Sequence, residues 1–218
     1  MAQKFDAIAD AYDRWYDTPE GQAVFQAEVA CLRAIRKKVR GRWLEVGVGT
    51  GRFALALGVK EGIDPSPRML EKAAGRGIRT YLGAAEHLPF PDGAFNGVLM
   101  SLSLCFMSDA EQAMRECARV VSASGSLLIG MIPADSPWGQ LYKRKGVEGH
   151  TVYSAATFYT CDEVVRLATD EGLVFDAAFS CLFSHPGSPV IETSPREGIV
   201  ESAGFVAVAF AQCYRLLV

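Results

Sequence analysis

Hydrophobic residues near the start of the chain recur at the three-and-four spacing of amphipathic helices. One series consists of Phe5, Ile8, Ala9, Tyr12, Trp15 and Tyr16 and ends before Pro19. A second series keeps the same period and consists of Phe25, Val29, Leu32, Ile35 and Val39. These patterns predict two helices within residues 1–40, which we expect to cap the rest of the protein.

From residue 43 onward the pattern changes to short apolar runs that alternate with helical segments. Strands are expected at 43–46, 59–63, 78–82, 95–101 and 126–132. Ser66 followed by Pro67 predicts the start of one intervening helix, and Ser108 with Glu111 forms a capping box for another. Such alternation is typical of a mostly parallel sheet with helices on both faces.

The pattern becomes less regular after Pro133. Residues 133–160 are largely polar, and a helix begins at Thr160, where Glu163 completes a capping box. Two further strands, 173–183 and 205–212, bring the prediction to a doubly wound α/β fold (Rossmann-like) with a seven-stranded sheet. We expect a single domain over 1–218, with 133–160 as an insertion on the substrate side.

The composition is that of an ordinary globular protein and excludes several classes. The net charge is −3 without an evident basic face, which disfavours a nucleic-acid partner. The six cysteines contain no C-x-x-C pair and the three histidines lie far apart, so neither a structural zinc site nor a secreted disulfide framework is indicated. The N-terminus is polar and the apolar runs are too short for membrane insertion. We expect a cytoplasmic protein without a metal, and the oligomeric state stays open.

A glycine loop follows the first predicted strand. Gly47, Gly49 and Gly51 allow crowded backbone conformations and the close approach of a ligand. Asp64 ends the second strand, 17 residues after Gly47, where doubly wound folds place an acid for the ribose hydroxyls of adenosine. The spacing G-x-G-x-G differs from the dinucleotide pattern G-x-G-x-x-G, and Glu45 is placed to bind an ammonium group. A helix cap and a polar strand end are the alternative roles of Asp64 and Glu45.

Four segments together resemble the class I S-adenosylmethionine (SAM)-dependent methyltransferases, specifically the small-molecule enzymes of the ubiquinone-biosynthesis type. They are LEVGVGTG (44–51), GIDPSPRML (62–70), GAAEHLPFPDGAF (83–95) and RVVSASGSLLIG (119–130). The resemblance extends from about Tyr12 to the C-terminus and implies SAM as the cofactor.

The resemblance also implies roles for individual residues. The residue matching Asp64 binds the ribose in this family, while those matching Pro65 and Met69 line the adenosine pocket. The segment matching Ala85 and Glu86 borders the adenine.

Further roles concern the methionine part of the cofactor and one departure from the family. The residue matching Ser101 lies near the methionine part, and the N-terminal helix often covers the cofactor. Tyr12 then belongs to an aromatic surface that favours the sulfonium cation, with core packing as the alternative. Ala84 stands where the family often has an aspartate that accepts from the adenine amino group. The alternatives are that Glu86 or a backbone carbonyl accepts in its place, or that packing alone holds the adenine.

These observations predict SAM-dependent methyl transfer, by in-line displacement, to a small-molecule acceptor that the sequence does not identify. No catalytic residue can be assigned. If a base is needed, His150 and Glu148 are the first candidates. His150 and His185 are also candidates for acceptor contact, although a structural or solvent-exposed role is the favoured interpretation of both. A non-catalytic SAM-binding protein remains an alternative. A nicotinamide-dependent oxidoreductase is disfavoured by the short glycine loop and by the lack of a catalytic Tyr-x-x-x-Lys pair.

Overall fold

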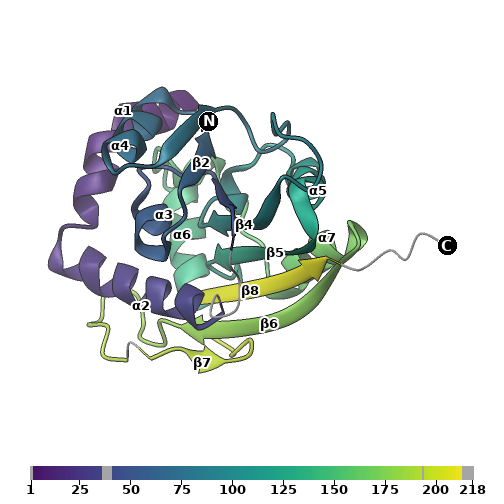
Figure 1. The fold of residues 1–218 in the computed structure, drawn as a ribbon. Coiled ribbons are helices and arrows are strands. Elements are labelled where there is room, and N and C mark those ends of the chain that lie inside the picture. The colour runs from purple at the N-terminus through teal and green to yellow at the C-terminus, as the bar shows by residue number, and fades with distance from the viewer. Residues whose placement is uncertain (1, 36–40, 193, 213–218) are drawn as a thin grey trace.

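The structure is a computed structural model that describes residues 2–35, 41–192 and 194–212. Its centre is one mixed sheet, whose strands are β1 (Trp43–Val46), β2 (Glu61–Asp64), β3 (Arg79–Leu82), β4 (Phe95–Ser101), β5 (Val121–Met131), β6 (Leu173–Cys181), β7 (Arg196–Glu197) and β8 (Phe205–Gln212). The strand order is β3-β2-β1-β4-β5-β8-β6-β7 (Figure 1). The first five are parallel, and β8 runs antiparallel between β5 and β6. The predicted doubly wound α/β class is confirmed.

The sheet differs from the prediction in two details. It has eight strands instead of seven, because Arg196 and Glu197 pair with the end of β6. A strand of two charged residues leaves no apolar run in the sequence. In addition, β5 begins at Val121 and not at Ser126, since the small residues 122–125 (Ser-Ala-Ser-Gly) extend the strand without an apolar pattern.

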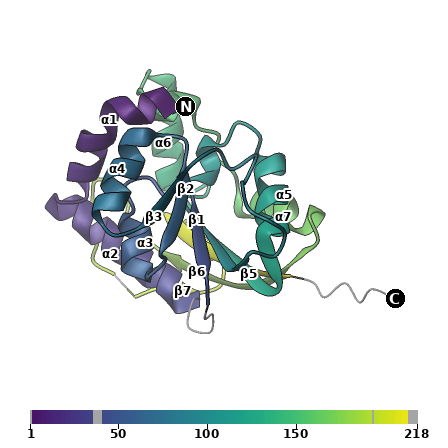
Figure 2. The same cartoon turned by 45° about the horizontal axis from the view of Figure 1, so that its top comes forward.

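Helices cover both faces of the sheet. They are α1 (Ala2–Trp15), α2 (Pro19–Ile35), α3 (Arg52–Leu57), α4 (Pro67–Gly75), α5 (Ala110–Val120), α6 (Pro137–Val147) and α7 (Cys161–Asp170), with short 3-10 helices η2 (Leu104–Phe106) and η3 (Tyr153–Ala155). On one face lie α2, α3 and α4, and on the other α5 and α7 (Figure 2). The apolar side chains accordingly form two core clusters, one on each side of the sheet.

The helix starts follow the capping signals in all but one case. Ser66 accepts a hydrogen bond from the Met69 N–H (3.2 Å), and the capping box at Thr160 is complete. The predicted capping box at Ser108 is wrong, because Asp109 caps α5 in its place. The side chain of Asp109 accepts a hydrogen bond from the Gln112 N–H, three residues further along the chain. The Ser108 hydroxyl instead donates a hydrogen bond to Glu86. Val39, predicted to belong to the second helix, lies outside the described residues.

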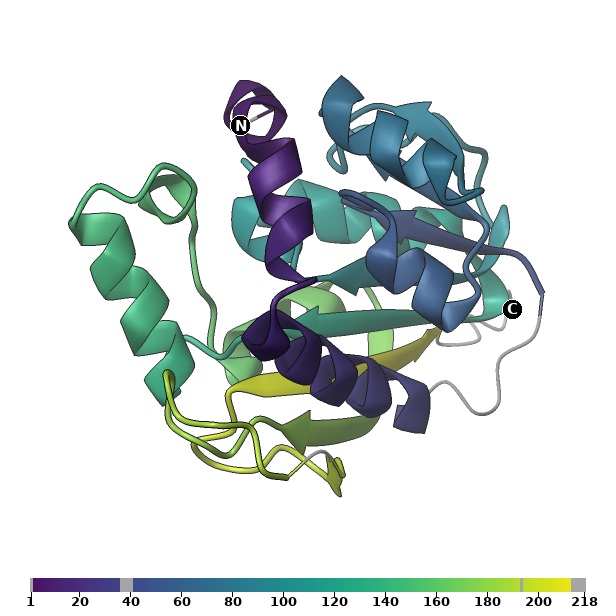
Figure 3. The same ribbon diagram turned by 90° about the vertical axis from the view of Figure 1, so that its left-hand side faces the viewer.

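Residues 133–160 contain regular structure that the pattern did not reveal. Ser136 and Pro137 start α6 in the same way as Ser66 and Pro67 start α4. Trp138 is buried on this helix. Figure 3 shows α1 standing between α4 and α6, so that α1 has a helix on either side.

Acidic residues at three-residue spacing hold α1 against its neighbours. Asp13 pairs with Arg52 Nε (2.8 Å) on α3 and with Arg76 Nη2 (2.8 Å) beyond α4. Asp10 pairs with Lys72 Nζ (2.6 Å) on α4. Because side chains three and four apart share one side of a helix, these contacts fix which side of α1 faces inward. The inward side carries the aromatic residues.

Candidate active site

A cavity of about 330 Å³, here called the first cavity, lies where the parallel strands β1, β2, β3 and β4 end. Its walls come from the loops after these strands and from α1. The predicted site residues that line it are Tyr12, Gly47, Gly49, Asp64, Pro65, Met69, Ala85, Glu86 and Ser101. Two others, Glu45 and Gly51, are not part of its wall. The fold therefore brings most of the predicted set together at the carboxyl edge of the sheet, the usual ligand position in this class.

The three loop glycines all have positive φ but meet different surroundings. A Cβ on Gly47 would lie 2.4 Å from the Cβ of Ser103, so this position requires glycine for packing as well as for conformation. Gly51 packs against Ala73 of α4, where a Cβ would lie at 3.0 Å. Gly49 faces open space and lines the first cavity. Among the three, Gly49 is the position where a ligand can approach the backbone.

Asp64 is fixed by two backbone hydrogen bonds. Oδ2 accepts from the Gly49 N–H and Oδ1 from the Ser66 N–H, each at 2.9 Å. Burial raises the pKa of this carboxyl, and the two N–H groups oppose that rise. A carboxylate oxygen has two acceptor sites, so each oxygen retains one toward the cavity. This arrangement fits two neighbouring hydroxyl groups.

Glu45 is a buried carboxyl beside the glycine loop. It is 1% exposed, and its Oε2 has no hydrogen-bond partner among the described residues. Burial raises its pKa well above the ordinary value, whereas Ser101 and the Ala54 backbone lower it. Ser101 lines the first cavity, and its hydroxyl lies beside this carboxyl. Unpaired buried acceptors are costly, so a bound ammonium or hydroxyl group would stabilise this corner.

Glu86 supports the opposite wall. Its Oε1 accepts from the Ser108 N–H (2.8 Å) and from the Ser108 hydroxyl (2.7 Å), which holds the loop before α5 over the cavity. Ala84 lines the cavity next to it. Met69 is 1% exposed and packs under the same wall. This end of the first cavity is therefore mainly apolar, with polar groups supplied by the backbone and Glu86.

A larger cavity of about 500 Å³, here called the second cavity, lies between α1, α2 and α6. Tyr12, Leu102 and Phe106 line both cavities, so the two meet at these side chains. Leu102 has a φ of 56°, unusual for a residue other than glycine, and its N–H donates to the Gly130 carbonyl (2.8 Å). Such strained backbone is often found at functional sites.

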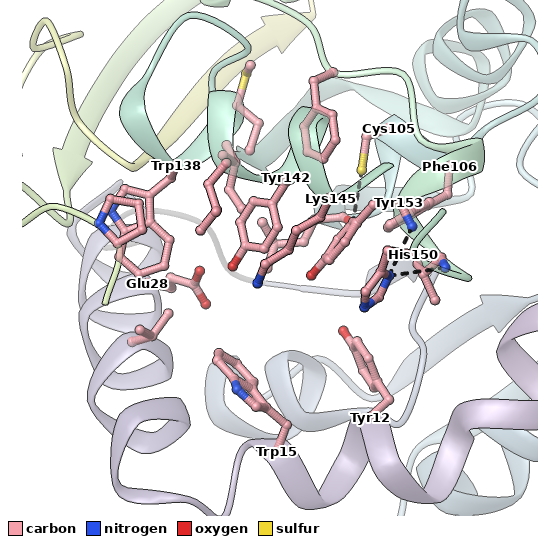
Figure 4. Close-up of a pocket in the computed structure, with 18 of the residues that line it drawn as sticks. Tyr12, Trp15, Glu28, Cys105, Phe106, Trp138, Tyr142, Lys145, His150 and Tyr153 are labelled. Atoms are coloured by element: carbon pink, nitrogen blue, oxygen red, sulfur yellow. Dashed lines mark hydrogen bonds between the residues drawn. The ribbon is translucent and has the colours of Figure 1, made fainter. Parts of the chain in front are cut away.

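Aromatic side chains dominate the second cavity (Figure 4). The rings of Tyr142 and Tyr153 lie 4.6 Å apart between centroids, and Trp138 lies 6.4 Å from Tyr142. His150 lines this cavity and stacks on Tyr153 at 4.5 Å. The other two sequence candidates, Glu148 and His185, are not part of its wall.

The sequence reasoning missed Glu28, a buried acid on α2. Its side chain is 2% exposed and lines the second cavity, and Oε2 has no hydrogen-bond partner within the described ranges. Burial raises its pKa to about 8, and Cys31 adds to the rise. The available signal was a charge on the apolar side of a helix, since Val24 and Leu32, four residues before and after Glu28, are buried.

The part of the chain that the structure describes shows neither a metal-binding cluster nor a membrane-spanning helix. Residues 2–35, 41–192 and 194–212 contain no group of three or more His, Cys, Asp or Glu that could hold a metal ion. No helix in these ranges is long and apolar enough to cross a membrane.

Comparisons with known proteins place this geometry in a family. Residues 44–129 match the family described as "Methyltransferase domain". An uncharacterized protein of Mycobacterium tuberculosis is 39% identical over 92% of this chain and 71% of its own length. A demethylmenaquinone methyltransferase of Thermotoga maritima is 29% identical over 84% of this chain and 88% of its length.

A solved structure from Thermotoga maritima has the same fold over nearly its whole length. It is described as a SAM-dependent methyltransferase, possible histamine N-methyltransferase. Its TM-score is 0.89 at 30% identity, and the match covers 97% of this chain and 99% of the other. The unpaired Oε2 of Glu45, the two fixed oxygens of Asp64 and the open space at Gly49 are compatible with the ammonium, ribose and carboxylate of SAM. The chain therefore belongs to the class I SAM-dependent methyltransferases, and SAM is its cofactor.

Proposed function

We propose that this protein transfers the methyl group of SAM, bound in the first cavity, to a small-molecule acceptor bound in the second. The observation that carries the proposal is the junction at Tyr12, Leu102 and Phe106, where the two cavities share a wall. A volume of about 500 Å³ and an aromatic lining are typical of small-molecule sites. The acceptor site so defined includes residues from the N-terminal helices and from 133–160, which act as cap and acceptor-side insertion.

Residues in the wall of the first cavity and next to it would hold the cofactor by complementary groups. Asp64 accepts from the two ribose hydroxyls, and Glu45 receives the ammonium group. The backbone at Gly49 approaches the carboxylate. Pro65, Met69, Ala85 and Glu86 surround the adenosine, while Ser101 and Tyr12 lie near the methionine part. Gly47 and Gly51 contribute by shaping the loop.

When bound, SAM supplies an electrophilic methyl group whose bond to sulfur breaks as the acceptor's lone pair forms the new bond. The side chains of this protein have to hold the acceptor atom in line with that bond and to exclude water. Tyr12, Leu102 and Phe106 are placed to do both, because they border both cavities. An acceptor that must lose a proton has His150 within the same cavity. Acceptors with a free lone pair need no base.

Neither alternative gains support. A nicotinamide-dependent oxidoreductase is not favoured by the family or by the structural neighbour. A binding protein without activity does not account for a second cavity that opens onto the first. The description of the Thermotoga structure as a possible histamine N-methyltransferase agrees with a small-molecule acceptor.

The test combines cofactor binding with the destination of the methyl group. Calorimetry with S-adenosylhomocysteine (SAH) and with NADH should show binding of SAH alone. Tritiated methyl groups from SAM should then enter a small-molecule extract and not purified RNA or protein. Ile132→Trp adds bulk to the second cavity only, so it should reduce transfer while SAH affinity stays unchanged. Label in RNA or protein, or equal transfer by the variant, would refute the proposed acceptor class.

A further inference from the structure

The second cavity contains a buried acid that the cofactor site does not use. Glu28 is 2% exposed, and Figure 4 shows its carboxylate pointing into the space bounded by Trp15, Trp138 and Tyr142. Its Oε2 has no hydrogen-bond partner among the described residues. In the same ranges no lysine, arginine or histidine forms an ion pair with it. A buried oxygen in this state is costly, because it has lost water without gaining a hydrogen-bond partner.

The surroundings of Glu28 suit a cation. Faces of aromatic rings attract positive charge, and the wall near Glu28 includes two tryptophans and Tyr142. The Trp138 ring is fixed by a hydrogen bond from its Nε1 to the Ser184 carbonyl (2.9 Å). A carboxylate together with rigid aromatic faces provides both a hydrogen-bond acceptor and a low-polarity enclosure for an ammonium group.

One basic residue, Lys145, lines the same cavity and has to be considered. It is half-buried, and its Nζ lies 5.5 Å from the centre of the Tyr142 ring. It forms no ion pair with Glu28 among the described contacts, and it keeps access to solvent. Lys145 would favour an anionic acceptor and Glu28 a cationic one. Glu28 is buried and its Oε2 has no partner, so it gains more from a bound ion of opposite charge than Lys145, which is partly solvated. Glu28 therefore decides the sign of the charge that the acceptor carries.

We infer that the acceptor carries a basic amine, held as an ammonium ion by Glu28 at the end of the second cavity away from the cofactor. The inference rests on the proposed function, because it assigns the substrate class of that same cavity. In Figure 4 Glu28 and Trp138 lie on one side of the cavity, and Phe106 and Tyr12 lie on the other. Since Tyr12 and Phe106 mark the junction with the first cavity, the methylated atom is at the opposite end of the acceptor from this ammonium group.

The test uses three probes that share one ring system and differ in charge: tryptamine, tryptophol and indole-3-acetate. Each is titrated by calorimetry into the protein saturated with SAH. Tryptamine should bind more tightly than the other two. Glu28→Gln should lower tryptamine affinity by about tenfold or more, and leave tryptophol binding unchanged. Glu20→Gln is the matched control, because Glu20 is an exposed acid of the same cavity.

A second variant separates the two charges. Lys145→Met removes the cation that opposes an amine, so tryptamine affinity should stay the same or rise. Equal binding of tryptamine and tryptophol, unchanged tryptamine affinity in Glu28→Gln, or preference for indole-3-acetate that is lost in Lys145→Met would overturn the inference. Failure of the wild-type protein to bind SAH would instead refute the proposed function, so the two failures are distinguishable.

Discussion

Replacing Glu28 by glutamine should stabilise the free protein. Burial raises the pKa of Glu28 to about 8 from an ordinary value of 4.5. Between these values the unfolded chain is ionised while the folded protein keeps the proton, so folding takes up a proton and loses stability as pH rises. Glutamine mimics the protonated acid and does not titrate. The stability of the variant therefore does not fall in this way as pH rises.

The size of the effect follows from the two pKa values. Each unit of difference corresponds to about 1.4 kcal/mol, so the advantage of Glu28→Gln should be about 1 kcal/mol at pH 5, about 3 at pH 7 and about 5 at pH 9. Above pH 8 both states of the wild-type protein are ionised and the advantage levels off. Glu45 titrates in both proteins and cancels from the comparison.

Urea denaturation of the two proteins at pH 5, 7 and 9, without SAM or SAH, measures this difference. The dependence of the unfolding free energy on urea concentration should be the same for both proteins, since the surface that unfolding exposes is unchanged. If the difference in unfolding free energy between the wild-type protein and Glu28→Gln stays constant from pH 5 to 9, Glu28 is already ionised or already paired in the free protein. That result would refute the reasoning and would remove the cost on which the amine site depends.

Three further predictions concern the cofactor cavity and its cover. Asp13→Asn should destabilise the protein by about 1 to 2 kcal/mol at pH 7, because burial raises the pKa of Asp13 but its two arginine partners outweigh this and hold it at about 2. The loss should disappear in urea titrations as pH falls from about 4 to 2, where the wild-type carboxylate is itself protonated; a loss independent of pH would contradict this. Gly47→Ala should lower the thermal midpoint strongly, since its Cβ would collide with a side chain. Gly49→Ala strains a positive φ but meets no atom, so it should lower the midpoint less and should also weaken SAH binding in calorimetry. Equal effects of both on folding would be inconsistent with the assigned roles. Asp64→Asn should reduce SAH affinity by about tenfold or more, as one charged acceptor is lost, and unchanged affinity would remove Asp64 from the site.

The sequence predicted the sheet and the cofactor cavity well for a common physical reason. Short apolar runs ended by glycine or aspartate mark the carboxyl edge of a parallel sheet, and the ligand lies at that edge. Gly49 and Asp64 could therefore be named from this pattern, whereas Ser101 was named only through the resemblance to the methyltransferase family. Their hydrogen bonds could not be predicted, because Asp64 at the end of β2 accepts from the backbone N–H of Gly49, which lies in the loop after β1.

The acceptor cavity was less predictable, since its wall is assembled from distant segments. Glu28 belongs to α2, Tyr142 to α6 and Tyr12 to α1, and periodicity within each helix gives no information about which helices meet. The hydrophobic periodicity of α6 is weak because one side of this helix faces the second cavity instead of the hydrophobic core. An acid on an otherwise apolar helix side, as at Glu28, is the one local signal that the sequence offered.

The attachment of α1 has a consequence for the timing of turnover. This helix contributes wall to both cavities, so a movement that opens one also opens the other. Release of the methylated product and of SAH would then be coupled to a single opening event. The ion pairs at Asp10 and Asp13 restrain that event, and dissolved salt weakens pairs that are partly exposed. Steady-state turnover limited by product release would consequently increase with ionic strength, even though the methyl transfer itself involves no change at these residues.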